Sequence, residues 1–179
     1  SLGITVVYVT HDQTEAMTLA DEIALMKDGV IVQRDTPRKL YNYPNDVFGG
    51  WFLGNPGMNF VEYPVNGTPE LAEPLFAKPV RFQNSGNNQR VSVGIRPEYV
   101  RVHLEDAPNA VRGKLQRKAV AVGGQYLLII QFGEQIIKAK VAPEIGVRAS
   151  ENVWVECPLD AITLFGEDGT KIETELVTI

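Results

Sequence analysis

The stretch ITVVYVTHDQTEAMTLADEIALMKDG, residues 4–29, carries the pattern of a strand, a short helix and a second strand. Ile4 to Thr10 is a β-branched run that is apolar at successive positions, which is typical of a strand buried on both faces of a parallel sheet. His11 stands where this strand should end. We expect the run either to fray or, if it is ordered, to bury its apolar face against a second copy or against the rest of the chain.

Asp12 and Glu15 have the spacing of a capping box, in which each side chain accepts a hydrogen bond from a free amide at the helix start. A short helix is therefore predicted to follow His11. Its inward face is predicted to consist of Ala16, Met17, Leu19 and Ala20.

The next segments are a hairpin and a second helix. Asp28-Gly29 lies between two apolar runs, and this dipeptide supplies the positive φ angles of a tight turn. Thr36-Pro37 predicts a helix with Thr36 as its N-cap and Pro37 at its first position, where the missing N–H costs nothing. Tyr43-Pro44-Asn45 is expected to end this helix. The opening of the chain thus has α/β character.

Residues 47–60 mix glycine and proline with large apolar side chains. A flexible tether is richer in serine and poorer in aromatic residues, so an ordered connection that packs on its neighbours is predicted. Trp51 is expected to anchor it.

After Phe60 the pattern changes to short strands separated by turn residues. Seven runs rich in Val, Ile, Leu or Tyr are predicted as strands: 91–97, 99–104, 113–122, 126–132, 134–141, 152–158 and 161–165. Closely spaced strands without intervening helices predict a small antiparallel barrel or sandwich. Residues 65–89 read as loops with one or two strands. The predicted fold class is mainly β, preceded by the α/β segment.

Composition limits the functions that the chain can have. The 179 residues are 44% hydrophobic and 22% charged, as in ordinary globular proteins. No apolar run reaches the ~18 residues that span a bilayer, and no basic and apolar leader opens the chain, so we expect a soluble protein. A net charge of −5 provides no basic field for nucleic acid. Cys157, the one cysteine, suits a reducing cytosol and is predicted to be a core residue.

Three stretches, 5–60, 93–100 and 113–179, resemble the ATPase subunits of carbohydrate ABC importers, of the maltose and glycerol-3-phosphate type. The first contains YVTHDQTEAMTLADEIALMKDG and the second VGIRPEYV. In that family a G-x-P-x-M-N-F motif, here Gly54 to Phe60, leads from the nucleotide-binding domain into a regulatory domain built on strands like those of oligonucleotide/oligosaccharide-binding (OB) barrels. The resemblance implies three parts: the end of a nucleotide-binding domain at 1–46, a linker at 47–60, and an OB-like regulatory and dimerisation domain at 61–179.

The resemblance also implies a role for His11. It maps onto the switch histidine, which contacts the γ-phosphate of ATP and helps to orient the attacking water. ATP and Mg²⁺ are the implied cofactors of an intact subunit. The phosphate loop, the signature sequence and the acidic general base would all precede Ser1, and the chain contains no G-x-x-x-x-G-K-[ST]. For this chain alone we therefore expect no cofactor, no metal and no ATP hydrolysis.

Gly94, Arg96, Pro97 and Glu98 form a second candidate site. Pro97 is predicted to end a strand, and Arg96 and Glu98 to pair across the turn. The resemblance offers an alternative, in which this segment lies near the regulatory contact between two subunits.

Three further motifs favour structural interpretations. Gly123-Gly124-Gln125 looks like part of the ABC signature, but β-type runs flank it, so a tight strand connection is predicted. Asn66-Gly67-Thr68 matches the glycosylation pattern by chance, in a loop. Trp154 alternates with Val153 and Val155 and is expected in the core or at an interface.

Two functions remain open. The first is a regulatory and dimerising module of an importer ATPase, cytoplasmic and peripheral to the inner face of the membrane, which works with permease subunits and regulatory proteins. The sequence does not identify the transported solute, because other subunits of such importers select it. The second is a sensor of a small oxyanion or sugar, to which Gly123-Gly124-Gln125 and Lys114 to Lys118 would contribute.

Overall fold

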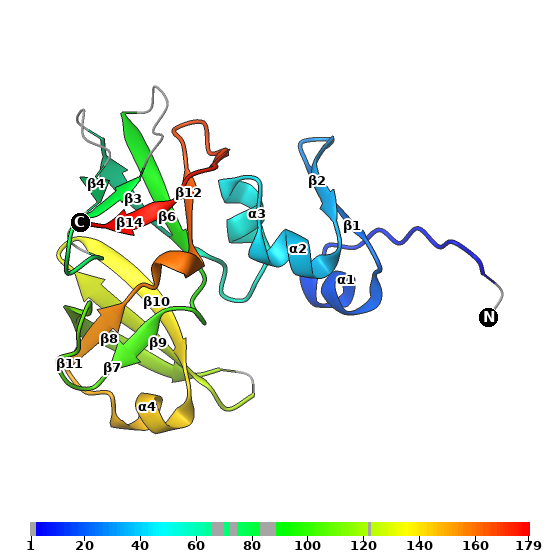
Figure 1. The fold of residues 1–179 in the computed structure, drawn as a ribbon. Coiled ribbons are helices and arrows are strands. Elements are labelled where there is room, and N and C mark those ends of the chain that lie inside the picture. Colours follow the sequence, from blue (N-terminus) through cyan, green and yellow to red (C-terminus); the bar gives the residue numbers. More distant parts are fainter. Residues whose placement is uncertain (1–2, 66–69, 72–74, 83–88, 122) are drawn as a thin grey trace.

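The computed structural model describes residues 3–65, 70–71, 75–82, 89–121 and 123–179, and these are mainly β (Figure 1). The helices are α1 (Gln13–Leu19), α2 (Pro37–Asn42), α3 (Val47–Phe52) and α4 (Pro143–Arg148), with the 3-10 helix η1 (Leu159–Ala161). The strands are β1 (Ile23–Lys27), β2 (Val30–Asp35), β3 (Asn59–Pro64), β4 (Glu70–Leu71), β5 (Val80–Phe82), β6 (Arg90–Ile95), β7 (Arg101–His103), β8 (Val111–Val120), β9 (Tyr126–Phe132), β10 (Gln135–Val141), β11 (Asn152–Glu156), β12 (Ile162–Phe165), β13 (Lys171–Ile172) and β14 (Leu176–Thr178).

Helices α1–α3 and the β1–β2 hairpin form a small unit beside the strands β3–β14, and we call these two parts the α/β segment and the β domain (Figure 1). The hairpin turns at Asp28 (φ 50°) and Gly29 (φ 80°), which confirms the prediction for this dipeptide. A separate small core holds the segment together; its buried members are Leu25, Leu40 and Leu53. The predicted second helix is also confirmed as α2, with Thr36 as its N-cap.

Half of the predicted capping box is present at α1. The Asp12 side chain accepts hydrogen bonds from the amides of Thr14 (2.8 Å) and Glu15 (3.1 Å). The reciprocal bond is replaced, because the Asp12 amide donates to Thr10 Oγ1 at 2.9 Å. Met17 packs on the small core, but Leu19 is 75% exposed, so its predicted inward position is wrong.

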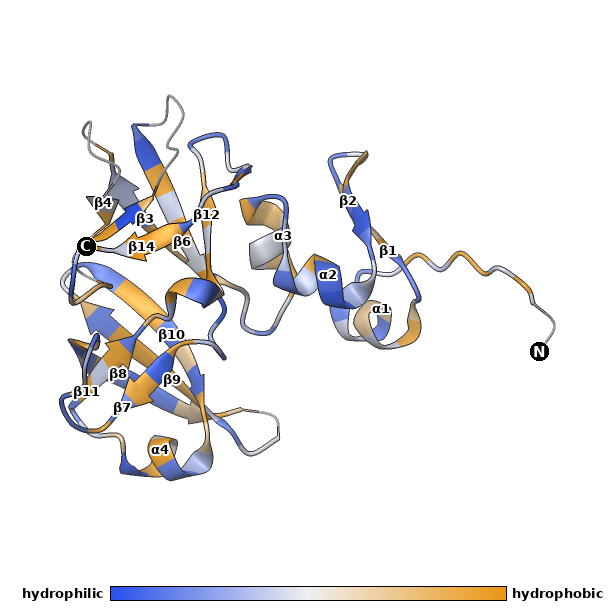
Figure 2. Cartoon of the chain, viewed as in Figure 1, coloured by the Kyte–Doolittle hydropathy of each residue, from blue (hydrophilic) through white to orange (hydrophobic). Residues whose placement is uncertain are grey.

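The predicted strand Ile4–Thr10 is wrong for this structure. No strand is assigned between residues 3 and 12, and the apolar side chains stand in solvent, with Ile4 71% and Val9 90% exposed. A strand needs neighbouring strands to receive its backbone hydrogen bonds, and the described part of the chain provides none there. The extended apolar segment leads away from the β domain, so it is not buried against it (Figure 2).

All seven predicted strands of the β domain are confirmed as β6–β12. Their sheets are antiparallel throughout, in the orders β10-β9-β8-β11-β7, β13-β12-β6-β3 and β14-β5-β4. The curled antiparallel sheets give the OB-like β domain that the sequence predicted. Strand β3 begins at Asn59, within the predicted connection, and the helix α4 was not predicted.

Alternating apolar residues on the strands build one core between the sheets. On β9 the buried positions are Leu128, Ile130 and Phe132, each separated by a less buried residue. Cys157 lies in this core as predicted, and Trp154 is half-buried. Gly123 and Gly124 both have positive φ in the β8–β9 connection, so the predicted tight strand connection is confirmed. Asn66-Gly67-Thr68 lies outside the described residues.

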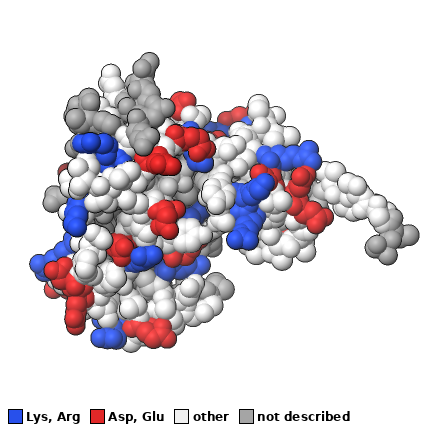
Figure 3. Space-filling model, viewed as in Figure 1, with Lys and Arg blue, Asp and Glu red and all other residues white. Residues whose placement is uncertain are grey.

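The connection at 47–59 is ordered as predicted, but it contains helix α3. Trp51 is 61% exposed, so the predicted anchor is wrong. Phe48 and Phe52 pack on the small core instead, with their rings stacked at 5.3 Å. Among the described helices, none is both long and apolar enough to cross a membrane. Acidic and basic side chains are interspersed over the face seen in Figure 3.

Candidate functional site

A buried arginine joins the α/β segment to the β domain. Arg96 follows strand β6 directly, is 1% exposed and is among the largest fully buried side chains of the described residues. Its Nε and Nη2 donate to the carbonyl of Tyr41 at 3.2 and 2.7 Å, and its Nη1 donates to the carbonyls of Gly50 (2.8 Å) and Leu53. One side chain of the β domain therefore binds the ends of both α2 and α3. We call this set of contacts, made by Arg96 with Tyr41, Gly50 and Leu53, the joint.

The Arg96 charge is held by carbonyl dipoles and by an aromatic ring. The guanidinium carbon lies 4.0 Å from the centroid of the Tyr41 ring, within the range of a cation–π contact. Burial lowers the pKa of Arg96, and the neighbouring Tyr41 and Glu98 oppose that shift. Among the ion pairs of the described residues none joins Arg96 to Glu98, so the predicted pairing across the turn is wrong.

Glu98 and Tyr99 extend the same joint on its surface. The hydroxyl of Tyr41 donates to Glu98 Oε1 at 2.5 Å, and the hydroxyl of Tyr99 donates to Asn42 Oδ1 at 3.1 Å. The pKa of Tyr41 is raised above its ordinary range, mainly by burial and to a smaller extent by the hydrogen bond to Glu98. Both bonds cross from helix α2 to the turn between β6 and β7.

The joint continues toward His11 through Gln13. The side-chain oxygen of Gln13, the first residue of α1, accepts a hydrogen bond of 2.9 Å from the amide of Gly54. Gly54 has φ +118°, where residues other than glycine are strained. A Cβ at Gly54 would also lie 3.2 Å from Arg96 Nη1 and 3.2 Å from the Tyr41 ring. Gly54 of the connection thus contacts the start of α1 through Gln13 and contacts Arg96 as well.

The other residues of the GIRPE motif are mostly internal. Gly94 and Pro97 are buried with Arg96, whereas Glu98 is exposed. A Cβ at Gly94 would lie 2.7 Å from both the Met58 sulfur and the Phe165 ring, so there is no room for a side chain. Pro97 lies between β6 and β7, which confirms that it follows the end of a strand.

A second link ties the connection to the far sheet. The buried side chain of Asn59 donates to the carbonyl of Lys138 at 2.8 Å and accepts from its amide at 2.9 Å. The ammonium group of Lys138 donates to the carbonyl of Gly57 at 3.3 Å, and burial lowers the pKa of this lysine. The NPGMN stretch is therefore bonded to β10 in one sheet, while its last residue, Asn59, begins strand β3 in another sheet.

His11 stands at the exposed end of this chain of contacts. It directly precedes Asp12, the N-cap of α1, and its side chain is exposed. The described residues bring no glycine-rich phosphate cradle and no carboxylate cluster suited to a metal beside it. The described residues around His11 alone do not fit a nucleotide with Mg²⁺.

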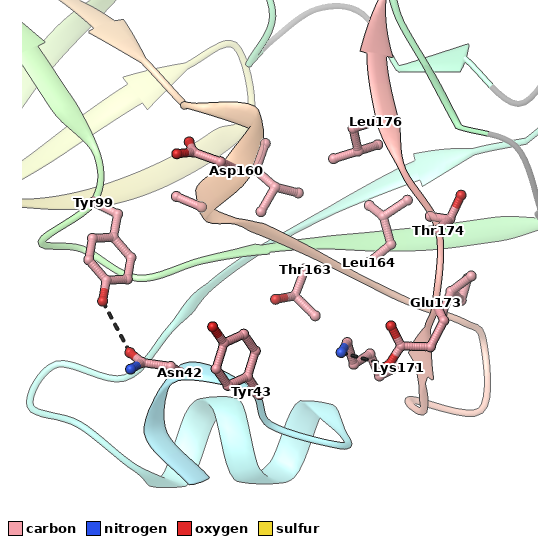
Figure 4. Close-up of a pocket in the computed structure, with 13 residues that line it drawn as sticks. Asn42, Tyr43, Tyr99, Asp160, Thr163, Leu164, Lys171, Glu173, Thr174 and Leu176 are labelled. Atoms are coloured by element: carbon pink, nitrogen blue, oxygen red, sulfur yellow. Dashed lines mark hydrogen bonds and ion pairs between the residues drawn. The ribbon is translucent and has the colours of Figure 1, made fainter. Parts of the chain in front are cut away.

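A cavity of about 440 Å³ lies beside the joint, between the end of α2 and strands β12–β14 (Figure 4). Asn42 and Tyr43 line it from the α/β segment, and Thr163 and Lys171 line it from the β domain. The ammonium group of Lys171 is paired with Glu173 at 2.7 Å. Because the cavity touches both parts, an occupant would contact both sides of the joint.

The residues suggested for oxyanion binding are arranged differently. Lys118 donates to the carbonyls of Gly146, Val147 and Ala149 at 3.1–3.3 Å, which satisfies the end of helix α4. The turn at Gly123 and Gly124 is not among the residues that line this cavity.

The sequence did not reveal Tyr41 and Gln13 as members of the joint, or Asn59 as a member of the second link. Their partners are backbone groups or residues more than 40 positions away, so no local spacing marks them. A polar residue between apolar strand positions, such as Asn59 before Phe60 and Val61, was the available indication.

Comparison with known proteins supplies relatives over most of the chain. It is 34% identical over 176 residues to the maltose/maltodextrin import ATP-binding protein MalK of Aliivibrio fischeri, covering 94% of this chain and 47% of that protein. It is 33% identical over 177 residues to the sn-glycerol-3-phosphate import ATP-binding protein UgpC of Vibrio vulnificus, covering 96% and 46%. No family model matches.

A shorter and more similar match is the diacetylchitobiose uptake system ATP-binding protein MsiK of Streptomyces coelicolor. The identity is 42% over 102 residues, which cover 55% of this chain and 27% of that protein. The chain therefore spans about half the length of MalK and UgpC.

Proposed function

The chain is homologous over most of its length to ATP-binding subunits of ABC importers for sugars and related solutes, and from this we propose that it is the regulatory C-terminal part of such a subunit. We propose the division into the end of a nucleotide-binding domain (1–46), a linker (47–60) and an OB-like regulatory and dimerisation domain (61–179). The observation that carries the proposal is the buried Arg96, which binds the ends of α2 and α3.

Arg96 supports regulation because it bonds the β domain to the ends of α2 and α3, so that a displacement of one part would act on the other. A regulatory domain acts on a catalytic segment only through differential contacts with it. The joint supplies contacts of this kind, since one guanidinium group donates to the carbonyls of Tyr41, Gly50 and Leu53 in the segment. In this proposal Gly94, Arg96, Pro97 and Glu98 serve regulation from inside one subunit.

Dimerisation is the second part of the proposal. ATP-driven import needs two nucleotide-binding domains to close and open, and a domain that holds its twin keeps their effective concentration high. Light scattering of the chain at tens of micromolar should report a dimer. A monomer throughout that range would contradict this part.

In the intact subunit we propose that His11 is the switch histidine that acts on ATP with Mg²⁺. Phosphoryl transfer depends on positioning and charge neutralisation, so loss of one positioned group lowers kcat. Replacing His11 by alanine in a full-length subunit should lower kcat at least 100-fold. The chain of residues 1–179 alone should not hydrolyse ATP, and turnover at the rate of the full-length subunit would overturn the proposal.

We further propose that the intact protein works with permease subunits and regulatory proteins at the cytoplasmic face of the membrane. The names of the relatives, which are import ATP-binding proteins, support this placement. The test is to purify the full-length subunit from cells that contain a permease pair and from cells that lack the permease genes. The subunit should co-purify with the membrane complex only in the first case.

The second candidate function is a small-ligand sensor, and the cavity at the joint favours it. Lys171 is already paired with Glu173, and Asp160 adds another carboxylate to the lining, so a neutral sugar fits better than an oxyanion. Calorimetry with maltose, phosphate and molybdate separates the two chemistries. Heat with none of the three would remove this candidate and leave the first untouched.

A further inference from the structure

The two ends of one peptide group meet the two sides of the joint. The carbonyl oxygen of Leu53 accepts a hydrogen bond from Arg96 Nη1, and the amide of Gly54 donates to Gln13 Oε1 at 2.9 Å. The C=O and the N–H that these bonds use belong to the same planar unit, the peptide bond between Leu53 and Gly54. Arg96 belongs to the β domain, and Gln13 begins the helix that follows His11.

We propose that the Leu53–Gly54 peptide group transmits the position of Arg96 to Gln13, and that Gln13 is thereby a positioning residue for His11. This inference rests on the proposed function, and it names the path by which the β domain would regulate the histidine. It requires no contact between Arg96 and Gln13 themselves.

The peptide group is rigid, which makes it suited to this role. Its planarity forbids the oxygen and the amide hydrogen from moving independently, so a tilt imposed at the carbonyl reorients the N–H. The positive φ of Gly54 and its close neighbours define that orientation: Arg96 Nη1, the Pro56 oxygen and the Tyr41 ring all lie 3.2 Å from a Cβ built there.

Charge strengthens the same coupling. A hydrogen bond from a guanidinium group is stronger than one between neutral groups, and it polarises the peptide group that accepts it. The Gly54 N–H therefore becomes a better donor to Gln13 while Arg96 is in place. Loss of either bond should weaken the other.

The route from Gln13 to His11 is short. Gln13 is the first residue of α1, and Asp12, the N-cap of that helix, is the only residue between them. Two amides of the first turn are held by the Asp12 carboxylate. A shift at Gln13 therefore moves the cap, and with it the backbone that carries His11.

The first test follows the Gly54 amide by NMR hydrogen exchange in the 179-residue chain. Gln13→Ala should speed exchange about three- to tenfold, because the Gly54 amide loses its hydrogen bond to Gln13, and the net stabilisation by one such hydrogen bond corresponds to a factor of this size. Arg96→Lys should speed it by a similar factor, since lysine lacks the fork that reaches three carbonyls. Thr18→Ala on the exposed side of α1 and Arg90→Lys on β6 are the matched controls, and both should leave it unchanged.

Combining the two changes decides between transmission and independent bonds. If the peptide group couples them, the double variant should exchange no faster than the more affected single variant. Multiplication of the two single effects would overturn the proposal, and so would a Gly54 amide that Arg96→Lys leaves untouched while the chain stays folded by circular dichroism.

The second test uses a full-length subunit and its ATPase kinetics. Gln13→Ala should lower kcat with little change in KM for ATP, because the nucleotide still binds while His11 loses its position. Gln13→Glu keeps an acceptor for the Gly54 amide and should restore most of kcat. An unchanged kcat in Gln13→Ala would overturn the positioning role alone, whereas an unchanged kcat in His11→Ala would overturn the proposed function.

Discussion

Replacing Arg96 by methionine should separate the two parts of the molecule. Methionine keeps an apolar stem of similar length, and it removes all the donors at once. The Gly50 carbonyl keeps a second partner, the Met58 amide at 3.1 Å. The carbonyls of Tyr41 and Leu53 rely on Arg96 and would be left without it.

The magnitude follows from those two carbonyls. A buried polar group that loses its partner costs about 1–3 kcal/mol, so two of them cost roughly 2–6 kcal/mol. The cation that is removed is buried and has no ion pair with a carboxylate among the described residues, so relief of its desolvation penalty offsets part of the loss. We therefore expect the free energy of unfolding of the α/β segment to fall by about 2–4 kcal/mol.

The assay is urea unfolding followed by tryptophan fluorescence. Trp51 lies on α3 beside the joint and Trp154 lies on β11, so single-tryptophan versions report the two parts separately. Arg96→Met should move the Trp51 transition to lower urea and leave the Trp154 transition nearly in place. Arg90→Met, on the strand that Arg96 follows but with an exposed side chain, should change either transition by less than about 0.5 kcal/mol. A loss below 1 kcal/mol for Arg96→Met, or an equal loss for Arg90→Met, would refute the reasoning.

Three other predictions concern single residues. Gly94→Ala should destabilise the β domain by about 1–3 kcal/mol in thermal unfolding, since a Cβ there would overlap Met58 and Phe165. Cys157 should resist thiol reagents at pH 8 until denaturant is added, because burial raises the pKa of its thiol to about 12; rapid labelling of the folded chain would contradict this. The raised pKa of Tyr41 means that the folded state keeps a proton which the unfolded state releases near pH 10, so stability is present below pH 10 and falls above it. Tyr41→Phe should make that alkaline decline shallower, by less than about 1.4 kcal/mol per pH unit because the phenol is half-buried, and an unchanged slope in urea titrations at pH 9–11 would count against it.

Local patterns sufficed for much of the fold. Asp28-Gly29 determines its turn by the φ angles that only a few residues adopt, and the alternation of Leu128, Ile130 and Phe132 gives a strand with one buried face. Such features depend on neighbours in sequence. For this reason the sequence predicted both the turn and the strand correctly.

Features that depend on distant partners were predicted poorly. The run Ile4–Thr10 has strand composition, but a strand exists only where another strand accepts its hydrogen bonds. Trp51 and Leu19 are large and apolar, and yet both stand in solvent because the small core is filled by other side chains. Arg96 was among the candidate residues, but its partners in the structure are backbone carbonyls, and a pattern of side chains in the sequence does not indicate which carbonyls will need a donor.

The chemistry of those carbonyls explains why residue 96 is an arginine. The last carbonyls of a helix lack partners within the helix and carry its negative partial charge. Helices α2 and α3 have six residues each, so Tyr41, Gly50 and Leu53 all lie in or just after a final turn. A guanidinium group offers five donors in a rigid fork, whereas an ammonium group has three around one atom. Arg96 therefore caps two helices at once from a different part of the chain, and among the described residues no carboxylate forms an ion pair with it. For the same reason we expect the orientation of both helices to depend on strand β6, which Arg96 directly follows, so that a displacement of β6 would also shift α2 and α3.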